Sequence, residues 1–271
     1  MSQIQTPSPT CLRVLQFTDL HLLEGQERRL AGVDTAESFR ACVALARRHH
    51  WPADLVLLTG DLAHEPEPAA YVRLHALLEE LQGPVYALPG NHDDGGLLRG
   101  MSHAGEPLVR HHAIRGAWQF VFLDSTVPGS DGGHLAAAEL DHLQDCLTGH
   151  PQHFTLVCLH HSPVALQSAW LDSMRIDNAA ALFQRLDAHP RPGGVLWGHV
   201  HQEHDSTYHG WRLLAAPSTC IQFAPGSQAF GLDPRPPGYR WLQLHDDGAI
   251  ETGVRRLAAL PPGFDPDAPG Y

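Results

Sequence analysis

Residues 88–94 read LPGNHDD and place an amide, an imidazole and two acids directly behind an apolar segment and a glycine. A solvated loop tip would tolerate this composition by chance. A site that holds a metal ion with one residue and donates a proton with the next would need it, because amide oxygens bind cations and histidine titrates near neutral pH. The segments around this stretch decide between the two interpretations.

Apolar segments with β-branched residues alternate with segments of helical periodicity around this stretch. The pattern predicts strands at 12–19, 54–61 and 84–90, with helices between them at 33–49 and 68–82. Asp34 or Thr35 is expected to cap the first helix. Consecutive units of this kind give parallel strands joined by right-handed crossovers.

The alternation continues with strands at 118–125, 154–160 and 194–199 and helices near 135–147 and 177–188. The last third changes character, since TYHGWRLLAAPS, YRWLQLHDDG and AIETGVRRL look like antiparallel strands with turns at 209–210 and 247–248. Between them, residues 224–238 form a loop of a length that is usually functional or mobile. We expect one domain over residues 1–260, flexible over about its first ten residues, and a Pro- and Gly-rich tail at 261–271.

Bulk composition narrows the class of protein. The chain has 271 residues and 43% apolar content, enough for one large α/β domain. Its 18 basic and 30 acidic residues give a net charge of −12, which argues against a nucleic-acid groove. The apolar runs are too short to span a bilayer, the N-terminus does not read as a signal peptide, and the five cysteines form no CxxC pair. We therefore expect a cytoplasmic protein that binds neither nucleic acid nor membrane; a monomer and a homodimer both stay open.

Polar side chains follow each predicted strand at the point where its apolar run stops. In chain order they are Asp19 and His21, Asp61, Asn91 and His92, His160 and His161, and His199 and His201. Because ligands bind beyond the carboxyl ends of the strands in open parallel sheets, we expect these side chains to meet at one edge.

All of these residue types offer an oxygen or nitrogen lone pair to a cation. The five strand ends deliver at least two Asp, one Asn and four His to this edge. Seven such groups are too many for one tetrahedral ion, but they suit two metal ions about 3.5–4 Å apart with one bridging carboxylate. A ligand set of carboxylates, imidazoles and an amide, without thiolates, suits Fe, Mn or Zn, with Fe or Mn favoured. Each short motif alone is a common turn feature, and only their order behind successive strands points to a site.

The order Asp-x-His, Gly-Asp, Gly-Asn-His-Asp, His and Gly-His-x-His resembles the calcineurin-like metallophosphoesterases, from residue 19 to residue 201. LLTGDLA, LPGNHD, LHHSP, WGHVHQE and LAAPSTCIQF are similar to segments of the bacterial class III 3′,5′-cyclic-AMP phosphodiesterases, within a likeness that spans residues 12–257. The resemblance implies a four-layer α/β/β/α metallophosphoesterase sandwich, with two mixed sheets flanked by helices. Two other branches fit less well: purple acid phosphatases carry a Tyr where this chain has His64, and protein Ser/Thr phosphatases carry Gly-Asp-x-x-Asp-Arg-Gly where it has GDLAHEP.

The resemblance also implies roles for the individual residues. Asp61 would bridge the two metal ions, and His92 would protonate the leaving oxygen without binding metal, so these two residues are the catalytic candidates. His161 is expected to be a packed imidazole behind the ligands. One ion would be held by Asp19, His21, Asp61 and His201, the other by Asp61, Asn91, His160 and His199, and the substrate would contact His21, Asp61, Asn91, His92 and His201.

These roles imply hydrolysis of 3′,5′-cyclic AMP to 5′-AMP by attack of a metal-bound hydroxide, which would lower the cellular level of cyclic AMP. The base would need an apolar or aromatic shelf, for which Phe223, Trp170 and the loop at 224–238 are candidates. Asp93 would either orient His92 or act as a capping acid. Two alternatives stay open: another small-molecule phosphodiesterase, such as a glycerophosphodiesterase, and a non-catalytic scaffold on the same fold.

Overall fold

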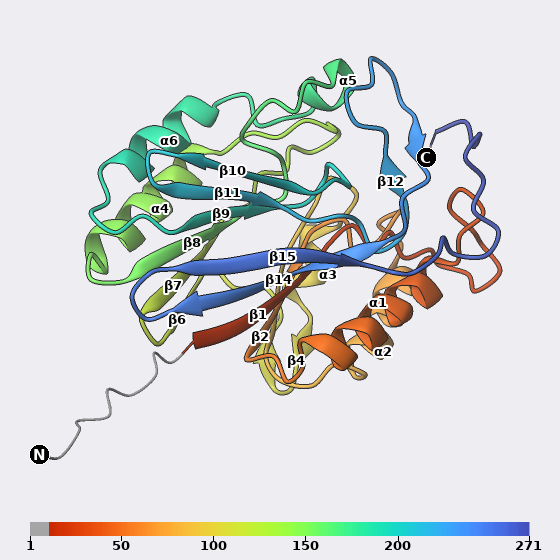
Figure 1. Ribbon diagram of the computed structural model, residues 1–271, viewed down its shortest axis with the longest axis horizontal. Coiled ribbons are helices and arrows are strands. Elements are labelled where there is room, and N and C mark those ends of the chain that lie inside the picture. Colours follow the sequence, from red (N-terminus) through yellow and green to blue (C-terminus); the bar gives the residue numbers. More distant parts are fainter. Residues whose placement is uncertain (1–10, 271) are drawn as a thin grey trace, which may run out of the picture.

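Two mixed β-sheets lie face to face, and helices cover the outer side of each sheet (Figure 1). The computed structural model describes residues 11–270, so the N-terminal residues expected to be flexible, and the last residue of the predicted tail, lie outside the described residues. The arrangement is the four-layer α/β/β/α sandwich that the resemblance implies.

The N-terminal β-α-β units and the last two strands build the first sheet. Its strands and the helices that flank it are β1 (Cys11–Phe17), α1 (Thr35–His49), β2 (Leu55–Thr59), α2 (Pro68–Leu78), β3 (Val85–Leu88), β14 (Gly238–His245) and β15 (Ile250–Arg256). The strand order is β15-β14-β1-β2-β3, in which β1, β2 and β3 are parallel and β14 and β15 are antiparallel. Asp34 caps α1, because its carboxylate accepts the amide of Glu37 at 3.1 Å.

The middle of the chain builds the second sheet. Its strands and the helices that flank it are β6 (His112–Arg115), β7 (Trp118–Phe122), α4 (Ala137–Gly149), β8 (Phe154–Cys158), α6 (Ala179–Asp187), β9 (Gly194–Trp197), β10 (His204–Tyr208) and β11 (Trp211–Ala215). The strand order is β10-β11-β9-β8-β7-β6. The predicted hairpin at the turn 209–210 is confirmed as β10 and β11, but β11 also pairs in parallel with β9 and so belongs to the parallel part of the sheet.

Several short elements lie in the connections and were not predicted. They are α3 (Gly95–Arg99), β4 (Ser102–His103), β5 (Glu106–Pro107), α5 (Ala169–Asp172), β12 (Gln222–Phe223) and β13 (Leu232–Asp233). The end of α2 also differs from the prediction, since the helix stops at Leu78 and not at residue 82. Leu81 is buried and continues the apolar spacing, but it packs from a turn in which its amide donates to the carbonyl of Leu78.

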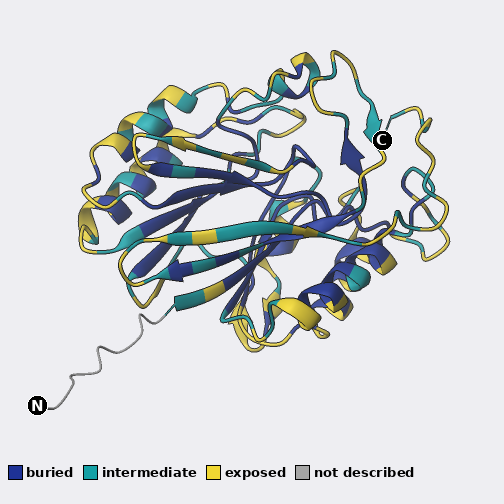
Figure 2. Cartoon of the chain, viewed as in Figure 1, coloured by how far each residue is buried: buried dark blue, intermediate teal, exposed yellow. Residues whose placement is uncertain are grey.

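Three apolar clusters fill the spaces between the four layers. The cluster between the two sheets includes Leu57 and Tyr86 from the first sheet and Trp118, Phe120 and Leu196 from the second. The other two clusters lie under α1 and α2 and under α4 and α6. Figure 2 shows the consequence, with buried residues along the strands of both sheets and exposed residues on the outer side of α1. Within residues 11–270, no helix is long and apolar enough to cross a membrane.

Arg240 links the two sheets from inside the molecule. The side chain is fully buried on β14, and its guanidinium donates to the carbonyl of Ala215 at 2.9 and 3.1 Å and to that of His204 at 2.9 Å. A third donor reaches the hydroxyl of Thr252 at 3.0 Å. Burial lowers the pKa of Arg240 to about 10, so the guanidinium is still charged at neutral pH. One side chain therefore satisfies backbone acceptors of the second sheet from a strand of the first.

We predict that Arg240→Ala lowers the free energy of unfolding by about 2–5 kcal/mol, because buried carbonyls that lose their donor cost about 1–3 kcal/mol each. Urea denaturation followed by circular dichroism measures this change. The matched control is Arg255→Ala, since Arg255 is an exposed arginine on the neighbouring strand β15. Equal effects of the two substitutions would contradict a linking role for Arg240.

Candidate metal centre

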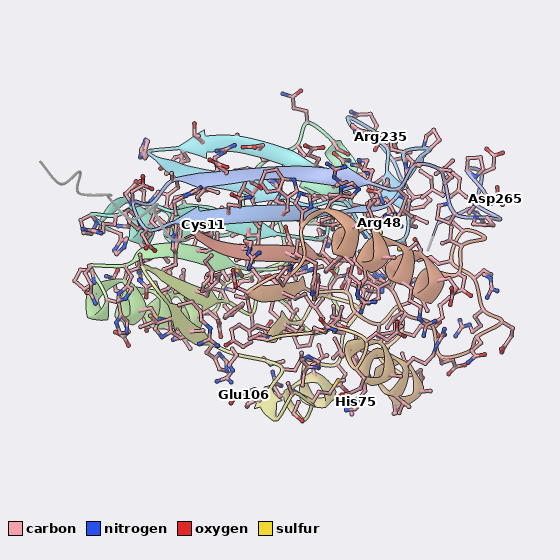
Figure 3. All side chains as sticks on the ribbon, turned by 60° about the horizontal axis from the view of Figure 1, so that its bottom comes forward. Cys11, Arg48, His75, Glu106, Arg235 and Asp265 are labelled. Atoms are coloured by element: carbon pink, nitrogen blue, oxygen red, sulfur yellow. The ribbon has the colours of Figure 1, made fainter. Side chains whose placement is uncertain are left out.

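The predicted ligands lie on loops that leave the carboxyl ends of β1, β2, β3, β8 and β9, so both sheets contribute to one site. In Figure 3, Cys11 marks the start of β1 on one side of the molecule. Arg235 and Asp265, from the C-terminal third of the chain, lie toward the opposite side. Asp265 belongs to a segment that returns to the loop after β1, where its amide donates to the carbonyl of Ala31 at 2.9 Å. The site therefore lies where the loops of both sheets and the C-terminal segment converge.

The backbone at this end is unusual. Positive φ angles of 46–66° occur at Asp19, His21, Asp61, His199 and His201, all of them predicted ligands. Residues with a Cβ rarely adopt this left-handed conformation, and such strained positions cost about 1–3 kcal/mol each. The surrounding structure must therefore hold these five residues in place.

Hydrogen bonds between the loops after β1 and β2 supply part of this support. The amide of Asp19 donates to the carbonyl of Gly60 at 3.0 Å, and the amide of His21 donates to the carbonyl of Asp61 at 2.9 Å. The carboxylate of Asp19 in turn accepts the amide of His199 at 2.9 and 3.1 Å, which ties the first sheet to the second. Asp19, Asp61, His21 and His199 are thus all held by hydrogen bonds of their backbone.

Asp61 lies between two groups of predicted ligand atoms. On one side, its Oδ2 is 3.7 Å from Nε2 of His21, and that nitrogen is 3.2 Å from Nε2 of His201. On the other side, Oδ2 is 3.2 Å from Nε2 of His160. Asp19 completes the first group, with 3.7 Å between its Oδ1 and Nε2 of His201. One carboxylate oxygen is therefore within reach of both groups.

The second group is completed by the amide oxygen of Asn91. Its Oδ1 lies 3.1 Å from Nε2 of His160 and 3.1 Å from Nδ1 of His199. The structure therefore brings together all seven of the residues that the sequence predicted as ligands. Four overlapping sets of His and Asp nitrogen and oxygen atoms that could hold an ion occur in the described residues, and three of them contain only buried residues from this group and His161.

Outer hydrogen bonds set the orientation of two imidazoles. His160 donates from Nδ1 to the carbonyl of Thr59 at 2.8 Å, and His201 donates from Nδ1 to the carbonyl of Ile221 at 2.8 Å. Each Nε2 is then left as a lone pair toward the centre, which is the arrangement that metal-binding histidines use. Phe223 supports His201 from behind, since the two rings stack at 4.0 Å and 11°.

Burial and charge make the centre suitable for cations. Burial raises the pKa of Asp19 to about 8. Burial alone would also raise the pKa of Asp61, but the charges of His160, His92 and His21 and the hydrogen bond with His160 together hold it well below its usual range. Burial lowers the pKa of His160, but the Asp61 carboxylate opposes this and raises it to about 9. Without a metal ion, a proton on His160 thus balances the charge of Asp61. A divalent cation competes for the same lone pairs.

Unpaired polar atoms support a fit to metal ions. Nε2 of His199 is buried and has no hydrogen-bond partner among the described residues, and buried Oδ2 of Asp61 has, at hydrogen-bonding distance, only the contact with Nε2 of His160 at 3.2 Å, whose geometry is poor for a hydrogen bond. Buried polar atoms normally have a hydrogen-bond partner, and a buried atom that lacks one is a candidate for binding an ion or a water molecule. The residue types and their approach to a common carboxylate therefore fit a pair of divalent ions.

His92 lies beside this centre with its ring held in a defined orientation. Its Nδ1 donates to the carbonyl of His64 at 2.8 Å, and its amide donates to Oδ1 of Asp61 at 3.0 Å. The His64 ring stacks on the His92 ring at 5.3 Å and 18°. His64 was not predicted to support the site, although its place three residues after Asp61 was the available signal, since purple acid phosphatases use that position.

Asp93 and His161 take structural positions. The Asp93 carboxylate accepts the amides of Gly90 at 2.9 Å, Leu62 at 3.1 Å and Ala63 at 3.0 Å, so it braces the loops after β2 and β3. Asp93 thus accepts backbone amides as a capping acid does, but it caps no helix, because the N-cap of α3 is Asp94. His161 is fully buried next to the second group, and its Nδ1 is 2.8 Å from the hydroxyl of Ser125.

Comparison with known proteins identifies the family. Residues 12–203 match the calcineurin-like phosphoesterase family. The chain belongs to this family. This calcineurin-like phosphoesterase shares 40% sequence identity with the 3′,5′-cyclic adenosine monophosphate phosphodiesterase CpdA of Pseudomonas aeruginosa, over 95% of this chain and 94% of that protein. It is 39% identical to CpdA of Escherichia coli K12 over 94% and 93% of the two chains, and 37% identical to a 3′,5′-cyclic-nucleotide phosphodiesterase of Nostoc over 91% and 92%.

Solved structures share the phosphoesterase fold at much lower identity. A dimetal phosphatase from Danio rerio superposes with a TM-score of 0.60 and 16% identity, over 92% of this chain and 99% of that chain. A purple acid phosphatase from yellow lupin gives a TM-score of 0.63 and 11% identity, over 92% of this chain and 52% of that chain. These similarities confirm the predicted fold class.

The Cα of Gly90 packs against Asp61, and we predict that Gly90→Ala removes metal binding. A Cβ at this position would lie 2.2 Å from Oδ1 and 2.4 Å from the amide nitrogen of Asp61, so the carboxylate would have to move. Elemental analysis of the purified variant after reconstitution with Mn²⁺ measures the loss. Gly149→Ala is the control, because a Cβ there meets nothing within 4 Å. Full metal content in Gly90→Ala would contradict the central position of Asp61.

Proposed function

We propose that this calcineurin-like phosphoesterase hydrolyses 3′,5′-cyclic AMP to 5′-AMP. The observation that carries the proposal is the placement of His92 beside Asp61, since the amide of His92 donates to Oδ1 of Asp61 at 3.0 Å. The other oxygen, Oδ2, lies between the two groups of predicted ligand atoms. A proton donor next to a two-metal centre is what cleavage of a phosphodiester requires. Relatives that cover nearly the whole chain and are named cyclic-AMP phosphodiesterases support the choice of substrate.

Two divalent ions would bind at the two groups around Asp61. When bound, such ions lower the pKa of a coordinated water to about 7 and neutralise negative charge on a phosphoryl group. We assign Fe or Mn to the sites, since carboxylate, imidazole and amide ligands suit both. One ion would be held by Asp19, His21, Asp61 and His201, and the other by Asp61, Asn91, His160 and His199.

His92 would supply the proton that the leaving 3′-oxygen needs. Because Nδ1 of His92 is committed to the carbonyl of His64 at 2.8 Å, the proton for transfer is carried on Nε2. The backbone bond from His92 to Asp61 fixes the distance between this ring and the metal ligands. His21, Asn91 and His201 would border the phosphate together with Asp61 and His92.

The five cysteines bear on the compartment. All of them are free thiols, and four are buried. Unpaired thiols suit a reducing compartment, so the cytoplasm is the location that we propose.

A substrate panel tests the function directly. Protein reconstituted with Mn²⁺ is expected to hydrolyse 3′,5′-cyclic AMP faster than glycerophosphodiesters, with 5′-AMP as the product resolved by chromatography. Removal of the metal with a chelator should abolish the reaction, and its return should restore it. Faster hydrolysis of a glycerophosphodiester would replace the proposed substrate, and inactivity on every diester would leave a scaffold as the better interpretation.

His92→Ala tests the proton donor. We expect turnover of cyclic AMP to fall by about 10²–10⁴-fold, the usual contribution of general acid catalysis, while both metal ions stay bound. Elemental analysis and steady-state kinetics separate the two effects. His75→Ala is the control, since His75 is an exposed histidine on α2 (Figure 3). Loss of metal in His92→Ala would show that His92 is a ligand.

A further inference from the structure

We propose that a small cavity beside the metal centre, lined by Trp170, Met174 and Phe230, holds the base of the nucleotide. The proposal rests on the proposed function and names the part of the protein that recognises the non-reacting end of the substrate. It assigns a binding role to residues of α5 and of the hairpin β12–β13, both of which lie outside the catalytic motifs.

The cavity has a volume of about 240 Å³ and two unlike walls. Asn91, His92 and His199 from the metal centre form one wall. Trp170, Met174 and Phe230, together with the buried Phe223, give apolar surface to the rest of the lining, which also includes Asp131 and Gly270. A ligand that fills the cavity must therefore present an anionic or polar group at one end and an apolar surface at the other.

The aromatic wall is arranged as a set of edge-to-face contacts. The Trp170 ring lies 5.3 Å from Phe230 at 86° and 4.9 Å from Phe223 at 81°. Phe223 is only 1% exposed and stacks on His201, so it serves as support for a ligand of the metal. Trp170, Met174 and Phe230 are each partly exposed, unlike Phe223. Of the three shelf candidates from the sequence, we assign the role to Trp170 and to the loop at 224–238, which carries Phe230, whereas the buried Phe223 supports them.

The two segments that carry the wall are tied together. The hydroxyl of Ser168, directly before α5, donates to the carbonyl of Ser227 at 2.8 Å, and Ser168 is fully buried. The amide of Ala224 donates to the carbonyl of Gly231 at 2.8 Å and closes the loop that carries Phe230. The wall is thus held in place by contacts within the protein, and a ligand loses less free energy in ordering it.

Size and surface chemistry identify the group that fits. The volume is below the range of roughly 300–1,000 Å³ that drug-sized ligands occupy, so one planar ring system with its sugar is the largest ligand to expect. Aromatic rings and a thioether both favour contact with the face or edge of such a ring. Stacking of a base on an aromatic side chain is worth about 1–3 kcal/mol. Glycerophosphodiesters offer no ring for this wall.

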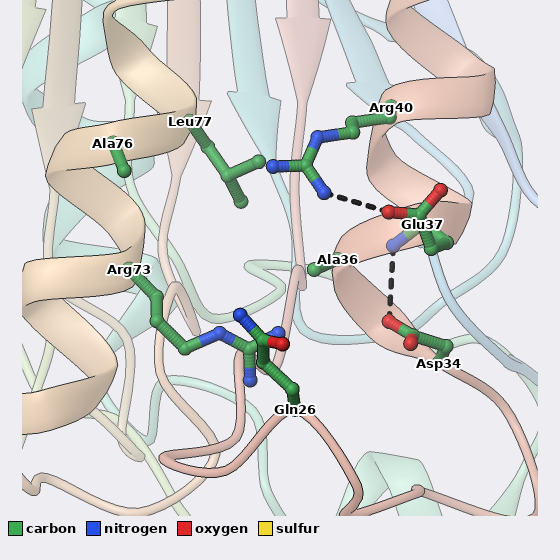
Figure 4. A pocket seen from close by; sticks show the side chains of 8 residues that line it. All are labelled: Gln26, Asp34, Ala36, Glu37, Arg40, Arg73, Ala76 and Leu77. Atoms are coloured by element: carbon green, nitrogen blue, oxygen red, sulfur yellow. Dashed lines mark hydrogen bonds and ion pairs between the residues drawn. The ribbon is translucent and has the colours of Figure 1, made fainter.

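A second cavity, between α1 and α2, has different properties (Figure 4). Its volume is about 290 Å³, but its lining contains no aromatic residue. Its charged groups already bind one another or the backbone, since Arg40 pairs with Glu37 at 2.6 Å and the carboxylate of Asp34 accepts the amide of Glu37. It also lacks residues of the metal centre. The aromatic cavity is the one joined to the proposed chemistry.

The test compares two ligands that differ only in the base. Isothermal titration of Mn²⁺-reconstituted protein measures the affinity for 5′-AMP and for ribose 5-phosphate. Wild-type protein is expected to bind 5′-AMP more tightly. Trp170→Leu and Phe230→Leu should each weaken 5′-AMP binding by about 5–100-fold, as loss of base stacking predicts, with ribose 5-phosphate binding unchanged. Trp170→Phe should restore most of the affinity, because it keeps an aromatic face.

Trp241→Leu is the matched control, since this half-buried tryptophan on β14 stacks on His50 at 5.0 Å, away from the centre. Equal affinity of the wild type for both ligands, or equal losses for both ligands in Trp170→Leu, would overturn the base pocket. The outcome is independent of turnover. A protein that fails to hydrolyse cyclic AMP but shows the expected binding difference would refute the proposed reaction and keep the pocket.

Discussion

The buried carboxylate of Asp61 is the constraint around which the rest of the site is arranged. Burying a charged carboxylate is costly unless it is compensated, and here one oxygen accepts the amide of His92 while the other faces two groups of histidines. Space for Asp61 exists only because Gly90 has no Cβ, and Gly60 gives the same freedom to His160, since a Cβ there would lie 2.3 Å from Nδ1 of that ring. Two glycines that look like ordinary turn residues therefore set the geometry of the centre.

A two-sheet fold explains how so many polar groups are buried at one place. Each sheet ends its parallel strands in short loops, and the face-to-face packing brings the two sets of loops together. The cluster between the sheets is apolar, so the loops are held by packing that does not involve the ligands themselves. The carboxylate of Asp19 then accepts the amide of His199 across the junction. The strained left-handed backbone at the ligands is stabilised by these contacts, which is how functional sites commonly retain strain.

The sequence predicted the parts of this arrangement that depend on local pattern. Strand-like segments followed by Asp, His or Asn gave the convergence of Asp61 and its neighbours at one edge, because parallel strands point their carboxyl ends the same way. It did not predict contacts made through the backbone, such as the carbonyl of His64 that holds His92, since any residue type supplies a carbonyl. The sequence also could not show that Phe223 is buried and Trp170 is partly exposed, because the burial of Phe223 depends on how β12 packs against His201. The early end of α2 was missed for a related reason, as Leu81 keeps a helical spacing while packing from a turn.

Metal binding and folding stability are coupled in a site of this kind. The five predicted ligands with positive φ and the close imidazoles oppose folding. A cation that binds only the native state would stabilise it by RT ln(1 + [M]/Kd), or about 2.7 kcal/mol at a concentration 100 times Kd. The net charge of −12 does not prevent an anionic substrate from approaching, since charges are screened over about 8 Å at physiological ionic strength and directly coordinated ions lie far closer. Ions bound at this centre would neutralise the phosphate and also offset the strain of the loops, so that catalysis and local stability would depend on one set of interactions.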